Sequence, residues 1–166
     1  SVGWLSRADL LFRKGNAGPS IKTPDAQMEG EFTFHYAIYA DDSSDLSSSF
    51  KEAYLFNIPA LAYQKGKGKG NLPSDFSFFQ LKPEGSLILS AIKKAEKGTG
   101  VILRLFNPFL SERKAKLTFS LSLKKAFLTD LEEKRIKSVG IKENSISLLA
   151  GKKKIVTLLL EFKIVN

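Results

Sequence analysis

Two arginines, a carboxylate and an asparagine lie close together near the start of the 166-residue chain, at Arg7, Asp9, Arg13 and Asn16. Arginine and asparagine side chains make directional hydrogen bonds, which suits gripping sugar hydroxyls or orienting a neighbouring carboxylate. The Gly-Asn-Ala-Gly-Pro run at residues 15–19 is typical of a tight loop that could present them. The same side chains also fit a structural role, in which salt bridges among them pin an irregular segment. Both interpretations remain open.

Catalysis by this chain alone is not expected. A zinc site needs about four ligands, usually from His, Cys or carboxylate side chains. The chain has one histidine, His35, and no cysteine. His35 lies between Phe34 and Tyr36 in an alternating segment, so we expect a partly buried, hydrogen-bonded strand residue. No Gly-x-Ser-x-Gly elbow supports a Ser-His-Asp arrangement. We therefore predict neither catalytic residues nor metal ligands in this chain.

Paired carboxylates are the usual machinery of glycosidases, and the adjacent pairs here are Asp41-Asp42 and Glu132-Glu133. Neighbouring side chains on a strand or turn usually point apart, so neither pair is expected to converge as acid and base. Aromatic rings that stack on sugars are a more plausible feature, with Trp4 as the strongest candidate. For Trp4, a place in the core, or at an interface with other parts of a longer protein, is favoured over sugar binding.

The elements that must position these residues are mostly strands. Side chains follow a period of two, as they do in strands, at residues 32–39, 87–92, 101–106 and 117–123. Residues 146–149 and 155–164 are expected to form two more strands. The last segment is apolar on both faces, which predicts a central strand. One helix is expected, starting at Asp45 or Ser47 and ending before Pro59. Short polar connections between the strands are typical of hairpins and Greek-key links. The pattern predicts an all-β, antiparallel β-sandwich with one short helix.

Composition limits the classes of function. No apolar run approaches the roughly 18 to 20 residues that a membrane span needs. The chain opens without a secretory signal pattern, and the absence of cysteine suits a reducing compartment. The net charge of +9 invites a nucleic-acid interpretation. The charge is nevertheless spread along the chain and carried mainly by lysine, so a solvated surface is the favoured interpretation.

Several segments, taken in order, resemble the C-terminal region of glycoside hydrolase family 38, the zinc-dependent α-mannosidases. They are the run from Ser6 to Pro19, the Thr-Pro-Asp-Ala-Gln sequence at 23–27, the alternating segment 32–39, and residues 89–96 leading to 102–108. The N-terminal positions that match are Ser6, Arg7, Asp9, Leu10, Arg13, Gly15, Gly18, Pro19, Ala26 and Gln27. Relatives often carry an acidic residue where Ala8 stands, which leaves Asp9 as the loop's carboxylate.

The resemblance implies a longer enzyme in which an N-terminal α/β catalytic domain carries the zinc and the carboxylates. Hydrolysis there would be retaining, through a covalent mannosyl-enzyme on an aspartate. Nothing in this chain matches the zinc or nucleophile motifs. What matches is the late sandwich, where a loop ahead of a strand can reach back towards the cleft. On this basis Arg7, Asp9, Arg13 and Asn16 are candidates for the substrate rim.

We therefore predict that residues 1–166 form a single β-sandwich domain of the galactose mutarotase-like supersandwich type, excised from the C-terminal part of a larger α-mannosidase. The domain would be non-catalytic, hold no cofactor, complete the enzyme and rim its sugar cleft. The parent would use zinc or another divalent metal, act on α-mannosides in the cytoplasm, and form a homo-oligomer. Its catalytic domain would be the partner of this domain, with neither nucleic acid nor membrane as a partner.

Two other classes of function remain open. A stand-alone carbohydrate-binding module would respond to mannose at Trp4, whereas a structural domain would not. A basic sandwich that binds nucleic acid would need aromatic residues interleaved with its lysines, and the Gly-Lys loop at 65–70 has none. That absence argues against nucleic-acid binding.

Overall fold

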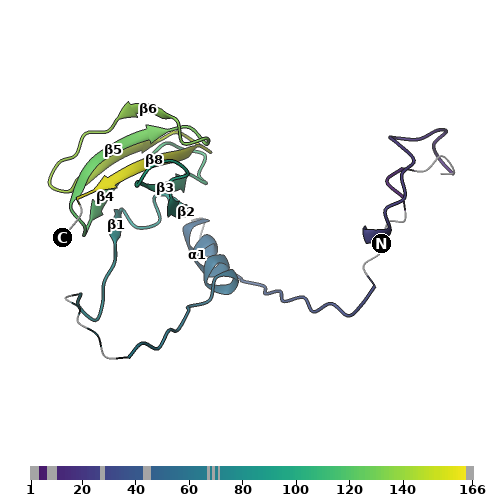
Figure 1. Ribbon diagram of the computed structural model, residues 1–166, viewed down its shortest axis with the longest axis horizontal. Coiled ribbons are helices and arrows are strands. Elements are labelled where there is room, and N and C mark those ends of the chain that lie inside the picture. Colours follow the sequence, from purple (N-terminus) through teal and green to yellow (C-terminus); the bar gives the residue numbers. More distant parts are fainter. Residues whose placement is uncertain are drawn as a thin grey trace. The chain divides into compact units, whose positions relative to one another are not determined.

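The computed structural model describes residues 4–6, 11–26, 29–42, 46–66, 68, 70 and 72–163. The chain divides into two compact units, Ser1–Ile38 and Tyr39–Asn166. The first unit contains a short 3-10 helix, η1 (Pro24–Ala26), and the second contains the α-helix α1 (Leu46–Asn57) and every strand that the described residues form (Figure 1). The predicted single domain over 1–166 remains a prediction, since the described strands of the sandwich span residues 79–162.

Eight strands in the second unit form two antiparallel sheets. The strands are β1 (Phe79–Lys82), β2 (Ile88–Lys94), β3 (Val101–Phe106), β4 (Arg113–Phe119), β5 (Leu123–Thr129), β6 (Arg135–Ser138), β7 (Ser145–Ala150) and β8 (Ile155–Phe162). One sheet has the order β1-β4-β7 and the other has the order β2-β3-β8-β5-β6. The predicted antiparallel β-sandwich with one short helix is therefore confirmed.

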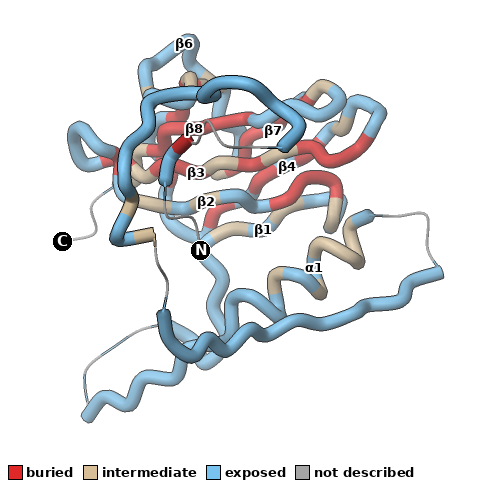
Figure 2. Tube along the Cα trace, turned by 90° about the vertical axis from the view of Figure 1, so that its right-hand side faces the viewer, coloured by how far each residue is buried: buried red, intermediate tan, exposed pale blue. Residues whose placement is uncertain are grey.

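The main core lies between the two sheets and follows the alternation of the sequence. Leu103, Leu117, Ile146 and Leu158 contribute to it from β3, β4, β7 and β8, and all four are buried. The buried residues concentrate in the strands, as Figure 2 shows. On each of these strands, every second side chain points to the inner face of its sheet. The inner faces of the two sheets pack against each other, as in a sandwich.

Strand β8 is central in the five-stranded sheet, as its apolar sequence predicts. Its even-numbered residues from Val156 to Leu160 join the core between the sheets. On its other face, Leu159 packs with Ile102 and Ala95 in a second, smaller cluster. Gly100 lies against this cluster, where an added Cβ atom would stand 2.5 Å from a Leu159 methyl carbon. The glycine therefore allows the hairpin between β2 and β3 to approach β8 closely.

The predicted strand at 117–123 is wrong in one respect, because the chain turns in its middle. β4 ends at Phe119 and β5 begins at Leu123. At this turn the side chain of Asn144 makes the hydrogen bonds that a neighbouring strand would otherwise make. Its Oδ1 accepts from the Leu123 N–H at 2.7 Å. Its Nδ2 donates to the Leu121 carbonyl at 2.9 Å and to the Phe119 carbonyl. Leu121, which lies in this turn, is exposed.

The predicted strand at 32–39 is also wrong, within the residues that the structure describes. Residues 32–39 have no regular secondary structure and every one of them is exposed. His35, expected to be partly buried in a strand, is exposed with them. The physical reason is pairing, because a strand buries its apolar face only when a neighbouring strand satisfies its backbone.

Helix α1 forms where the sequence predicts and lies against strand β2. The Tyr54 hydroxyl donates to the Leu89 carbonyl at 2.8 Å. The Phe50 ring meets the Phe106 ring edge-on, with centroids 5.3 Å apart. The helix ends as the Ile58 N–H bonds back to the Tyr54 carbonyl at 2.8 Å, immediately before Pro59.

A buried asparagine ties three segments together at one end of the sandwich. Asn107 follows β3 and is fully buried. Its Nδ2 lies 2.8 Å from the Ser111 carbonyl, 3.0 Å from that of Ala150 and 2.9 Å from that of Gly151. Its Oδ1 accepts from the Phe109 N–H at 2.9 Å. One amide thus satisfies both the loop after β3 and the turn between β7 and β8.

Replacing Asn107 with alanine is expected to lower the free energy of unfolding by about 3 kcal/mol, because it leaves several buried backbone groups without partners. Asn107→Asp should do at least as much harm, since it sets a carboxylate against three carbonyl oxygens. Urea denaturation measures both. The matched control is Asn57→Ala, which removes one exposed side-chain bond to the Ala53 carbonyl and should cost about 1 kcal/mol or less. Equal losses at Asn107 and Asn57 would contradict this role.

Candidate functional site

The first candidate site is the N-terminal loop, which is closed at its base and held by a serine. Trp4 and Lys22 form an isolated antiparallel bridge, and the Leu5 N–H donates to the Ile21 carbonyl at 2.9 Å. The Ser6 hydroxyl accepts from the N–H of Ala17 at 2.9 Å and from that of Gly18 at 3.2 Å. Ser6 is buried and therefore fixes the return arm of the loop.

The predicted rim residues are only partly testable in this loop. Arg7 and Asp9 lie outside the described residues. Arg13 and Asn16 are both exposed, on either side of Gly15, whose φ of 80° places it in the left-handed region. The loop therefore presents Arg13 and Asn16 to solvent, and their role at a sugar cleft stays a prediction. Sequence reasoning missed the anchoring role of Ser6, since a serine before an irregular run carries no distinctive signal.

Trp4 does not belong to the core among the described residues. Its side chain is 37% exposed, and the Lys22 ammonium group lies 5.5 Å from the centroid of its ring. A cation over an aromatic face is a favourable contact. The core interpretation of Trp4 is therefore wrong. The interpretation as an interface with other parts of a longer protein, and the one as a sugar-stacking ring, both stay predictions.

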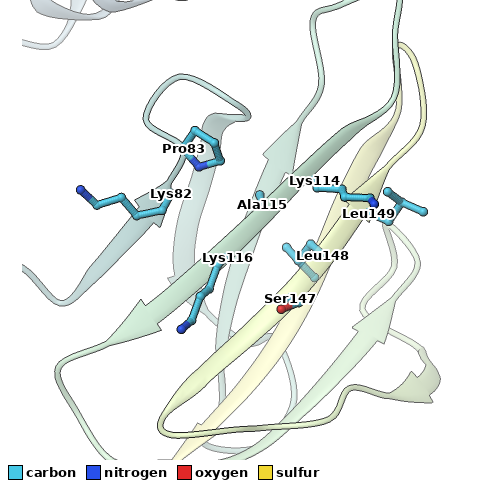
Figure 3. Close-up of a pocket in the computed structure, with 8 residues that line it drawn as sticks. All are labelled: Lys82, Pro83, Lys114, Ala115, Lys116, Ser147, Leu148 and Leu149. Atoms are coloured by element: carbon cyan, nitrogen blue, oxygen red, sulfur yellow. The ribbon is translucent and has the colours of Figure 1, made fainter.

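The second candidate site is an open hollow on the outer face of the three-stranded sheet. It has a volume of about 450 Å³. It is lined by side chains of β1, β4 and β7 and by Pro83, as Figure 3 shows. Lys82 and Lys116 are direct cross-strand partners, and Lys114 lies on the same face of β4. Like charges placed opposite each other on a sheet are mildly destabilising. The concentrated positive charge also attracts anions to this face.

The chemistry of this hollow is limited to electrostatic attraction. Among the described residues, no ion pair joins Lys82, Lys114 or Lys116 to a carboxylate. The lining also lacks an acid, a histidine or a cysteine that could act with the lysines. In the part of the chain that the structure describes, no three His, Cys, Asp or Glu side chains come together as a metal site requires. The described residues therefore do not fit a catalytic zinc ion.

The adjacent carboxylates Glu132 and Glu133 point to different partners, as the sequence predicts. Glu132 pairs with Lys134 on the surface. Glu133 is 11% exposed, lies 2.8 Å from the Lys93 ammonium group and accepts from the Glu96 N–H at 2.8 Å. The hydrogen bond from Lys93 holds the pKa of the Glu133 carboxyl below its ordinary value of 4.5. Glu133 in turn raises the pKa of Lys93 above 10.5. The cluster locks the turn after β5 to strand β2.

A further hollow of about 890 Å³ lies between helix α1 and strand β2. Phe50, Tyr54, Leu87 and Ile88 contribute to its mainly apolar wall. Its lining also includes the polar side chains of Lys51 and Glu84. Among the described residues, no helix has the length and apolar character needed to cross a membrane.

Comparison with known proteins shows what the sandwich is similar to. Residues 86–158 match the model of the glycosyl hydrolases family 38 C-terminal beta sandwich domain. The matched segment begins just before β2 and ends within β8. The predicted resemblance to glycoside hydrolase family 38 is thereby confirmed over this segment.

A particular relative extends the similarity beyond the family match. A protein of Halalkalibacterium halodurans named "Putative mannosylglycerate hydrolase" is 28% identical to this chain over 129 residues. The aligned region is 77% of this chain and 14% of the relative. The chain thus corresponds to a small part of the length of that hydrolase.

The Ser6 anchor makes a testable prediction about the N-terminal loop. In Ser6→Ala, the amides of Ala17 and Gly18 lose their acceptor and should exchange with solvent roughly fivefold to tenfold faster. Amide hydrogen exchange followed by NMR measures this directly. The control is Ser20→Ala, a nearby exposed serine, which should leave both rates unchanged. Unchanged rates in Ser6→Ala would show that the hydroxyl does not hold the loop.

The Glu133 cluster predicts how stability depends on pH. Because the folded-state pKa of Glu133 is lowered, its contribution is present above about pH 4.5 and is lost as the pH falls through the folded-state value. Lys93 behaves oppositely: its contribution is present below pH 10.5 and is lost as the pH rises through its raised pKa. Glu133→Gln cannot ionise, so its stability should fall less steeply on acidification than that of the unmodified protein.

Urea denaturation at several pH values below neutrality measures these slopes. Glu132→Gln serves as the control, because Glu132 makes only an exposed pair with Lys134 and should leave the slope unchanged. Parallel curves for the unmodified protein and Glu133→Gln would overturn the assignment.

Proposed function

We propose that this chain is the non-catalytic C-terminal β-sandwich of a larger family 38 glycosidase, a retaining α-mannosidase. Its role is to complete the architecture of that enzyme, with the catalytic domain of the same protein as its partner. The observation that carries the proposal is the family match over residues 86–158, in a chain that spans 14% of its hydrolase relative.

The described residues support the non-catalytic role. They bring together no metal-binding group of three His, Cys, Asp or Glu side chains. The hollow on the three-stranded sheet is lined by lysines and apolar side chains, without a carboxylate. The zinc or other divalent metal and the nucleophile would accordingly come from the rest of the longer protein. Cytoplasmic location and a homo-oligomeric state are further parts of this proposal.

The same comparison supports the substrate class that we propose. The relative's name specifies mannosylglycerate, in which a mannosyl group is joined to glycerate, a carboxylate. We include mannosylglycerate beside neutral α-mannosides as a substrate of the longer protein. The exposed loop with Arg13 and Asn16 would then lie at the rim of the cleft, where guanidinium and amide groups can bind hydroxyls or a carboxylate.

The activity of pure proteins tests the proposal. The isolated chain with added zinc should hydrolyse neither a chromogenic α-mannoside nor mannosylglycerate. The longer protein should hydrolyse at least one of them and lose activity when a chelator removes its metal. Turnover by the pure isolated chain would contradict the non-catalytic role, and an inactive, metal-loaded longer protein would contradict the glycosidase assignment.

A further inference from the structure

The segment at residues 32–39 has the sequence of a strand but the surroundings of a loop. Phe32, Phe34, Tyr36 and Ile38 alternate with Thr33, His35, Ala37 and Tyr39. In the structure Phe34 is 81% exposed, Tyr36 is 84% exposed and Ile38 is 93% exposed. Four apolar side chains of one parity are thus open to water along a backbone with no regular structure. An apolar row of this kind marks a surface made for a partner.

A second segment on the other side of α1 repeats this feature. Residues 58–64 have no regular structure beyond a bend at their start, and all are exposed. Leu61 is 95% exposed and Tyr63 is 89% exposed. The helix between the two segments packs on strand β2, so its surroundings differ from those of the two exposed segments.

The edges of the chain's own sandwich fit the segment 32–39 poorly. Of the four edge strands, β1 and β6 have four residues each and β7 has six, so these three are shorter than this eight-residue segment. The edge of β2 is approached by α1, whose Tyr54 hydroxyl bonds to the Leu89 carbonyl. The core between the sheets is already closed, with Leu103, Leu117 and Leu158 fully buried. The sandwich therefore needs no further strand to complete its core.

We propose that residues 32–39 form a strand of a further sheet, separate from the two sheets of the sandwich and built with strands of a longer polypeptide to which the chain belongs. The row Phe32, Phe34, Tyr36 and Ile38 faces the core of that sheet, and His35 lies on its opposite face. The inference rests on the proposed function in one respect, namely that a longer protein exists. The chain's 14% coverage of its relative leaves ample sequence for such a sheet. The segment thereby links the sandwich to the rest of the enzyme by backbone hydrogen bonds.

Hydrogen–deuterium exchange with mass spectrometry tests the pairing in two samples. One sample is the isolated chain at low and high concentration, and the other is the longer protein. Peptides covering 32–39 should exchange rapidly in the isolated chain at both concentrations. In the longer protein they should exchange about 100-fold more slowly, because paired amides must open before they exchange.

Side-chain variants test the assigned face. In the longer protein, Phe34→Asp should abolish the protection of 32–39, whereas the matched control His35→Asp on the other face should leave most of it. Neither variant should change the unfolding midpoint of the isolated chain, since both residues are exposed there. Equal effects of the two variants in the longer protein would overturn the assigned face.

Three other exchange results would overturn the proposal, and each has a different meaning. Protection in the isolated chain at both concentrations would mean that the segment pairs with its own sandwich. Protection that grows with concentration would mean pairing with a second copy. Rapid exchange in the longer protein would mean that no strand forms. A longer protein that protects 32–39 but hydrolyses no mannoside would retain this inference and remove the proposed function.

Discussion

The structure depends on the burial of strand β8 on both faces. Val156, Leu158 and Leu160 fill the core between the sheets, while Leu159 packs on the opposite face with Ile102. A strand that is apolar on both faces is stable only at the centre of a sheet, with neighbours on each side and layers above and below. β3 and β5 supply the neighbours, and β4 and β7 supply the facing layer. The sandwich of the second unit follows from this one requirement.

Outside the sandwich, the same requirement is left unmet. The residues at 32–39 and 58–64 carry apolar side chains but have no regular structure and are exposed. The closed core explains how the second unit can stand as a domain, and the exposed stretches explain why the chain makes better sense as part of a larger protein. This contrast, together with the family 38 match over residues 86–158, agrees with the structural role that we propose for the chain.

The sequence predicts the strands where local pattern and global packing agree. β3, β7, β8 and α1 lie close to their expected positions because alternation or helical spacing matches the burial that each element achieves. The break between β4 and β5 could not be predicted, because it depends on Asn144, which bonds to backbone groups more than 20 residues away in the sequence. At residues 32–39 the sequence predicts a strand that the structure does not contain. The local pattern is that of a strand, but a strand forms only where a neighbouring strand pairs with it. Arg13 and Asn16 lie in an exposed loop, as the sequence predicts. The role of Ser6 in holding this loop depends on contacts with Ala17 and Gly18, which the sequence does not reveal.

Our central claim is that the chain combines a self-sufficient sandwich with apolar stretches at residues 32–39 and 58–64 that are exposed to solvent. Limited chymotryptic digestion of the isolated chain, followed by mass spectrometry, tests this claim most directly. The account predicts early cleavage after Phe34, Tyr36 and Tyr63, and a resistant fragment that begins between Tyr63 and Phe79 and contains all eight strands. Cleavage within β3 or β8 at the same rate, or resistance of the whole chain including residues 32–39, would contradict it.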